Sequence, residues 1–108
     1  MKNILNSILL TLIATVSFGQ TTHTINAGSF YYTPSSLTVD LGDSIVWIND
    51  GGFHDVNGDV NSVTGQAYNN PETFDSPATN VVGAVLFAHK FNVAGNYSYD
   101  CSVAVSYT

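Results

Sequence analysis

Cys101 is the residue with the clearest capacity for chemistry in this chain. It is the only cysteine, and it ends residues 95–101, Gly-Asn-Tyr-Ser-Tyr-Asp-Cys, which are rich in aromatic side chains. A lone cysteine has no disulfide partner within its own chain. It is therefore buried and inert, cross-linked to another molecule, or bound to a metal.

His54 is the second candidate. It lies in residues 51–56, Gly-Gly-Phe-His-Asp-Val, where an extended run containing Trp47 passes into a loop. Cys101 also ends an extended run, so the two side chains meet at one pole of a β-structure if these ends coincide. Imidazole and thiolate suit copper or zinc, and a third nitrogen with a weak axial thioether would make a blue-copper site. A solvated loop histidine and a small buried cysteine are the alternatives without metal.

The other two histidines are not expected to complete such a site. His89 shares one face of residues 85–91 with Phe87 and Phe91, which places it in the middle of a strand, away from the strand ends. His23 stands close to the predicted start of the mature chain, where we expect it to be exposed.

The segments that must position these side chains follow a β pattern. Short runs rich in β-branched and aromatic residues, several of them alternating apolar and polar positions, predict strands. They cover residues 22–26, 30–32, 36–41, 44–49, 85–93 and 96–101. Strands at this spacing predict an all-β sandwich or small barrel. Residues 42–43 and 94–96 predict tight hairpin turns.

Residues 50–84 form a long irregular segment rich in Gly, Asn and Pro. Loops of this length in a compact domain are usually functional or disordered. We expect part of this one to be ordered, with a helical turn near residues 71–74, because Tyr68 and Phe74 need burial.

The N-terminus indicates export. Residues 1–19 begin with a basic Lys2, continue with an apolar run and end in small residues, which predicts a secretory signal peptide. The apolar run is too short to span a bilayer, which disfavours a membrane anchor. We therefore expect no stable membrane insertion after residues 1–19 are removed.

Length and charge limit the remaining domain and its partners. Lys90 is the only Lys or Arg outside the predicted signal peptide, against eight Asp and Glu. Without basic clusters the chain cannot neutralise phosphates, which excludes nucleic acid, whereas an acidic surface can steer cationic partners. The length allows one domain, residues 20–103, and a metal would help to stabilise its small core.

Three segments resemble the cupredoxin family, particularly plastocyanin-like small blue copper proteins. Residues 34–49, Pro-Ser-Ser-Leu-Thr-Val-Asp-Leu-Gly-Asp-Ser-Ile-Val-Trp-Ile-Asn, resemble the early strands of the family. Residues 52–56 resemble the segment of its first copper histidine. Residues 95–101 resemble the Gly-x-Tyr-x-Tyr/Phe-x-Cys approach to its thiolate ligand.

The resemblance implies a Greek-key β-sandwich or barrel that holds one type 1 copper ion. It makes His54 and Cys101 the metal ligands and gives Asp55 the place of a residue that ties the two ligand loops together. It also implies a monomeric electron carrier rather than an enzyme, with redox proteins as partners. The predicted signal peptide implies a periplasmic or extracellular location.

The chain departs from the family pattern after Cys101. Family members carry a second histidine, then a methionine, and a last strand, whereas residues 102–108 read Ser-Val-Ala-Val-Ser-Tyr-Thr and the only methionine is Met1. Residues 104–108 also match the translation of a transposase adapter end. We therefore expect residues 20–103 to be an incomplete domain without its last strand, second histidine and methionine, and residues 104–108 to be a non-native tail.

Two other classes of function stay open on the sequence alone. One is a secreted, metal-free β-sandwich that binds glycans or proteins, which copper binding would distinguish from a cupredoxin. The other is one domain of a copper oxidase or nitrite reductase, which requires further copper centres. The sequence has no nucleophile and base pair or paired carboxylates that would favour an enzyme.

Overall fold

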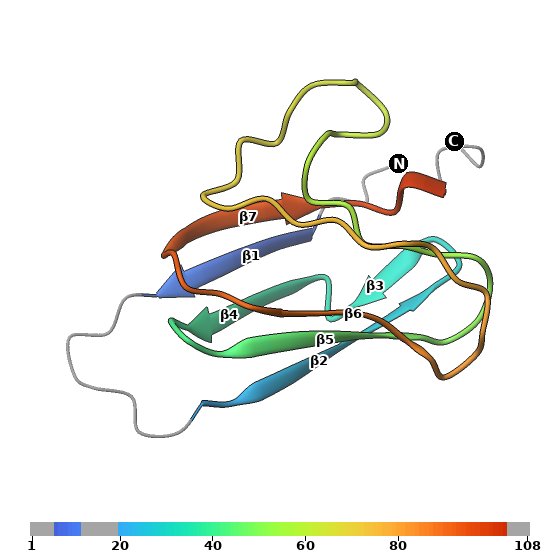
Figure 1. Ribbon diagram of the computed structural model, residues 1–108, viewed down its shortest axis with the longest axis horizontal. Helices are drawn as coiled ribbons and strands as arrows, with labels where there is room; N and C mark the ends of the chain where they lie inside the picture. The colour runs from blue at the N-terminus through green and yellow to red at the C-terminus, as the bar shows by residue number, and fades with distance from the viewer. Residues whose placement is uncertain (1–5, 12–19, 104–108) are drawn as a thin grey trace.

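A computed structural model describes the backbone of residues 6–11 and 20–103 and the side chains of residues 20–103. Within these residues the chain forms two sheets that pack against one another (Figure 1). The strands are β1 (Asn6–Thr11), β2 (Thr22–Gly28), β3 (Tyr31–Thr33), β4 (Ser36–Asp40), β5 (Ser44–Asn49), β6 (Val85–Lys90) and β7 (Gly95–Tyr99). One sheet has the order β4-β1-β7, and the other has the order β3-β2-β5-β6.

The alternating pattern of β5 explains how the core forms. Ile45, Trp47 and Asn49 are buried, and the residues between them are half-buried. The Trp47 ring lies 5.4 Å from the ring of Tyr99 in the other sheet and 6.0 Å from that of Phe74 in the long loop. Both sheets and the loop therefore contribute to one aromatic core, and the predicted all-β sandwich is confirmed.

The two predicted hairpins are wrong, because each connection joins strands of different sheets. Residues 41–43 lead from β4 to β5, and residues 91–94 lead from β6 to β7. Gly42, with a φ of 91°, donates its amide hydrogen to the Phe91 carbonyl at 2.8 Å, so the two crossings lie side by side. Gly, Asp and Asn favour a turn, but they do not determine whether the strands they join pair with each other.

Asp43 stabilises the connection between β4 and β5. Its carboxylate accepts hydrogen bonds from the amides of Thr21 (3.0 Å) and Asp40 (3.2 Å) and lies 2.8 Å from Nε2 of His23. Burial raises the pKa of Asp43, but these hydrogen bonds outweigh it, so the pKa is lowered overall. The folded state therefore favours the ionised carboxyl.

We expect the stability that Asp43 contributes to disappear in acid. A carboxyl with a lowered folded pKa stabilises the protein above its unfolded pKa of about 3.9, and this contribution is lost as the pH falls through the folded pKa. Urea unfolding of Asp43→Asn should show a deficit of about 1–2 kcal/mol at pH 6 that narrows below pH 4. Asp59→Asn, at an exposed site, is the control. A deficit that stays constant down to strong acid would contradict this prediction.

The long segment is ordered by isolated bridges rather than by helix. His54 pairs with Thr79, and Asn57 pairs with both Asp75 and Asp100. These pairings hold the segment against the end of β7. The prediction that part of the segment is ordered is thus confirmed.

Burial within this segment partly follows the prediction. Phe74 is buried, at 5% exposed, and Tyr68 is half-buried. No helical turn forms over residues 71–74, so that prediction is wrong. Phe74 instead lies in an extended stretch, because its neighbour Asp75 pairs with Asn57 and its ring reaches Trp47.

β1 is the middle strand of its sheet, parallel to β4 and antiparallel to β7. Its residues belong to the predicted signal peptide, and the segment lies between β4 and β7. The other parts of the predicted signal peptide, residues 1–5 and 12–19, and the predicted non-native tail, residues 104–108, lie outside the described residues. No helix in the described part of the chain is long and apolar enough to cross a membrane.

Candidate metal centre

The loop after β5 and the end of β7 bring His54 and Cys101 together at one pole of the sandwich. His54 Nδ1 lies 3.7 Å from Cys101 Sγ, and the two residues are 4% and 6% exposed. The main chain fixes this approach, because the Asn57 amide donates to the Asp100 carbonyl at 2.8 Å and the Asp100 amide donates back at 2.9 Å. The two predicted ligands are therefore buried neighbours.

The orientation of the His54 ring leaves one nitrogen available to a metal. Its Nε2 lies 2.6 Å from the Gly51 carbonyl oxygen. A carbonyl oxygen only accepts, so Nε2 carries the proton and the lone pair of Nδ1 faces Cys101. Bonds of about 2.0 Å to nitrogen and about 2.3 Å to sulfur can meet on one ion across the 3.7 Å separation, at an angle of about 119°. The pair therefore fits an ion bound by imidazole and thiolate.

Asp55 ties the two ligand segments together. Its Oδ1 accepts a hydrogen bond from the Ser102 amide at 2.7 Å, and the Ser102 hydroxyl donates to the other carboxylate oxygen. Burial raises the pKa of Asp55, while the hydrogen bonds from Ser102 act in the opposite direction. Because Asp55 follows His54 and Ser102 follows Cys101, these contacts give Asp55 the place that the resemblance implies for it.

Asn49 is a positioning residue that the sequence analysis did not single out. It is fully buried, and its Oδ1 accepts a hydrogen bond from the Gly51 amide at 3.0 Å. Its Nδ2 donates toward three carbonyl oxygens, those of Gly52 (2.9 Å), Thr79 (3.3 Å) and Val81 (3.2 Å). It thus holds the loop whose Gly51 carbonyl orients His54. The available signal was Asn49 itself, a polar residue at a position of β5 that points into the core. A buried side-chain amide needs hydrogen-bond partners, so such a residue indicates nearby polar groups.

Gly52 is the second such residue. It has a φ of +88°, and a Cβ at this position would lie 2.9 Å from His54 Nε2. Both the backbone conformation and the nearby ring therefore favour glycine.

We expect Gly52→Ala to weaken metal binding, because the added methyl group displaces the His54 ring. Gly65→Ala is the matched control, since Gly65 has a φ of +79° and nothing within 4 Å of its Cβ position. Both variants should lose about 1 kcal/mol of unfolding free energy. Only Gly52→Ala should lower copper affinity, by about tenfold, in competition with a Cu(I) chelator. Equal affinities for the two variants would show that the ring tolerates the methyl group.

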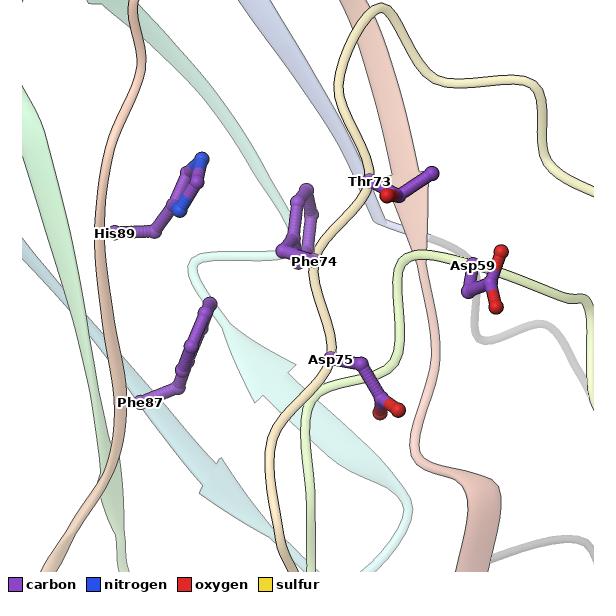
Figure 2. Close-up of a pocket in the computed structure, with 6 residues that line it drawn as sticks. All are labelled: Asp59, Thr73, Phe74, Asp75, Phe87 and His89. Carbon is purple, nitrogen blue, oxygen red and sulfur yellow. The ribbon is translucent and has the colours of Figure 1, made fainter.

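A separate hollow lies between β6 and residues 73–75 (Figure 2). Its lining consists of Asp59, Thr73, Phe74, Asp75, Phe87 and His89. His89 Nε2 lies 2.5 Å from a Glu72 carboxylate oxygen, and its ring packs against that of Phe74 at 5.3 Å. Neither His54 nor Cys101 lines this hollow, which agrees with the prediction that His89 is no part of their site.

Within residues 20–103, no group of three or more His, Cys, Asp or Glu side chains could hold a metal ion. His23 and His89 are paired with carboxylates, those of Asp43 and Glu72. Among the described residues, the predicted ligand pair therefore remains limited to His54 and Cys101.

Comparison with known proteins indicates the family of this chain independently of its structure. Residues 19–104 match a family model described as copper binding proteins, plastocyanin/azurin family. The chain is 27% identical over 81 residues to a plastocyanin of Scenedesmus fuscus, covering 70% of this chain and 76% of that protein. It is also 27% identical over 81 residues to a chloroplastic plastocyanin of Tetradesmus obliquus, covering 70% of this chain and 52% of that protein. No solved structure gives a significant match.

Proposed function

Because the chain belongs to the plastocyanin/azurin family of copper-binding proteins, we propose that it binds copper through His54 Nδ1 and Cys101 Sγ as an electron carrier. The observation that carries this proposal is the separation of 3.7 Å between these two buried atoms. Imidazole and thiolate are the strong ligands of blue-copper sites. The plastocyanin relatives support copper and electron transfer as the shared function.

The residues of this chain have defined roles in that function. When bound, copper supplies one-electron chemistry. The Gly51 carbonyl keeps the proton of His54 on Nε2, and Asn49 holds the loop that carries this carbonyl. Asp55 joins the His54 segment to Ser102, so partly buried hydrogen bonds would hold both ligand segments in place without a bound metal. Such supporting contacts orient ligands and tune affinity.

We further propose that the intact site takes its second histidine and an axial thioether from residues that follow Val103. The printed sequence has no histidine or methionine after Cys101. The printed chain should therefore bind copper with two protein ligands and without the intense blue absorption of a complete site. In the printed sequence, residues 104–108 would be a non-native tail that replaces the segment carrying those ligands.

Copper titration tests this proposal. Cu(I) and Cu(II) are added to the printed chain and to a version in which residues 104–108 are replaced by the tail encoded at the genomic locus. We expect both proteins to bind copper, and only the second to turn blue. Absence of binding to either protein would favour the metal-free β-sandwich, and a blue printed chain would show that other residues complete the site.

We propose that the protein is exported to the periplasm or the extracellular space and exchanges electrons there with redox proteins as a monomer. Residues 1–19 support export through their basic start, apolar run and small-residue end. Partner contact is supported by exposed apolar side chains near the His54 loop, with Phe53 51%, Val81 59% and Val82 70% exposed. The Val81 and Gly52 carbonyls share the Asn49 amide, so these side chains lie at the pole that holds His54.

A further inference from the structure

Asp100 places a buried carboxylate directly before Cys101 in the chain. Asp100 is 5% exposed, and its carboxylate accepts hydrogen bonds from the side-chain amide of Asn57 at 2.8 Å and from the hydroxyl of Ser62 at 3.0 Å. The main-chain amide of Ser62 donates a third hydrogen bond at 2.8 Å. All three donors are uncharged. Because they face the carboxylate with N–H and O–H groups, they match its ionised form, which only accepts.

No cationic side chain within residues 20–103 balances this charge. The ion pairs of these residues involve other carboxylates, those of Asp43 and Glu72. The only Lys or Arg among them, Lys90, is exposed on β6. Tyr68 stays neutral beside Asp100, because burial and the Asp100 carboxylate raise the pKa of its phenol. A buried charge without a cationic partner is costly, so the fold maintains an unbalanced negative charge at this position.

The position of Asp100 brings this charge close to the proposed copper ligands. Consecutive Cα atoms are about 3.8 Å apart, which keeps the carboxylate within about 10 Å of the Cys101 sulfur. Asn57, which pairs with Asp100 through both main chain and side chain, belongs to the same segment as His54. His54 and Cys101 are themselves buried. In such surroundings charges interact more strongly than in water, and salt screens them less.

A fixed negative charge at this distance distinguishes the two oxidation states of copper. One electron from a redox protein converts Cu(II) to Cu(I), which removes one positive charge from the site and transfers no proton. Because electrostatic attraction grows with the charge of the ion, a carboxylate attracts Cu(II) more strongly than Cu(I). The carboxylate therefore makes reduction less favourable.

We propose that the buried carboxylate of Asp100 sets the redox preference of the copper site, by holding an uncompensated negative charge that favours Cu(II) over Cu(I). The inference rests on the proposed copper binding by His54 and Cys101, and it extends that function to the reduction potential. Asp100 acts through its charge and not as a ligand, since its carboxylate oxygens are bonded to Asn57 and Ser62.

The Cu(I) and Cu(II) affinities of the full chain test this inference, each measured without oxygen by competition with a chelator. Asp100→Asn removes the charge and keeps the size of the side chain. We expect it to raise the ratio of Cu(I) affinity to Cu(II) affinity by about tenfold, which corresponds to a reduction potential about 59 mV higher. The effect should persist in concentrated sodium sulfate, because salt screens a buried charge poorly. Asp100→Ser, a second neutral side chain that can still accept a hydrogen bond, should change the ratio in the same direction.

Two matched variants separate the charge from the structure of the loop. Ser62→Ala removes a donor to Asp100 without changing any charge, so it should lower the midpoint of urea unfolding and leave the ratio within about twofold. Asp59→Asn removes one negative charge at an exposed position of the same loop, where water and salt screen it. It should also leave the ratio within about twofold.

The outcomes distinguish this inference from the proposed function. Equal ratios in the parent, Asp100→Asn and Asp100→Ser, with copper bound by all three, would overturn the inference and leave the proposed function standing. An equally large change in Ser62→Ala would overturn it as well, because the effect would then come from the structure of the loop. A parent chain that binds neither Cu(I) nor Cu(II) would overturn the proposed function, and this inference with it.

Discussion

Cys101→Ser is expected to lower the Cu(I) affinity of the full chain by at least about 100-fold, because a hydroxyl does not replace a soft thiolate as a ligand for Cu(I). The thiol sulfur lies 3.7 Å from His54 Nδ1, so its loss removes one of the two proposed ligands. Competition with a chromophoric Cu(I) chelator measures the change.

Two matched variants make this result specific. His23→Gln and His89→Gln remove imidazoles that are paired with Asp43 and Glu72, and they should leave the affinity unchanged within about twofold. His54→Gln should lower affinity, and its effect should be non-additive with that of Cys101→Ser, because both ligands act on one ion. A loss on His89→Gln as large as that on Cys101→Ser would contradict the assignment. Urea unfolding of each variant shows that the fold is retained.

Trp47→Ala is expected to destabilise the protein by about 3–5 kcal/mol, enough to unfold much of a small domain. Trp47 is fully buried at the centre of the core, within 6.0 Å of the rings of Phe74, Phe87 and Tyr99. Its removal would leave a cavity between the two sheets that these rings cannot fill without moving. Urea unfolding followed by far-ultraviolet circular dichroism measures the loss.

Trp47→Phe is the informative comparison. Within the described residues, Trp47 Nε1 is buried without a hydrogen-bond partner. Phenylalanine removes this unsatisfied donor and keeps most of the ring contacts, so we expect a loss below about 2 kcal/mol. If Trp47→Phe destabilised the protein as much as Trp47→Ala, the indole nitrogen would have a partner that stabilises the fold.

The sequence was sufficient to predict features that depend on local periodicity. The β-branched and aromatic residues of 44–49 predicted a strand, and the position of His54 and Cys101 at strand ends predicted that they meet if those ends coincide, which they do. Metal binding by these two residues stays a prediction. The tie between Asp55 and Ser102 followed from family resemblance and not from spacing.

Features that depend on distant partners could not be predicted. The turn at residues 42–43 looked like a hairpin, but β4 and β5 pair with other strands, and local turn chemistry carries no information on this choice. The role of Asn49 required knowledge of the loop carbonyls that surround it, including those of Thr79 and Val81. Likewise, nothing in the sequence of residues 50–84 shows that Asn57 bonds to Asp100.

The pairing pattern also bears on the order of events during synthesis. β2 pairs with β5 as well as with its neighbour in sequence, β3. β5 pairs with β6, although the long segment of residues 50–84 separates them. Asp100 accepts hydrogen bonds from Asn57 and Ser62, so that loop cannot close until nearly all of the chain has left the ribosome. Folds dominated by such distant contacts form slowly. A chain with this topology therefore completes its fold only after most of its residues have been synthesised.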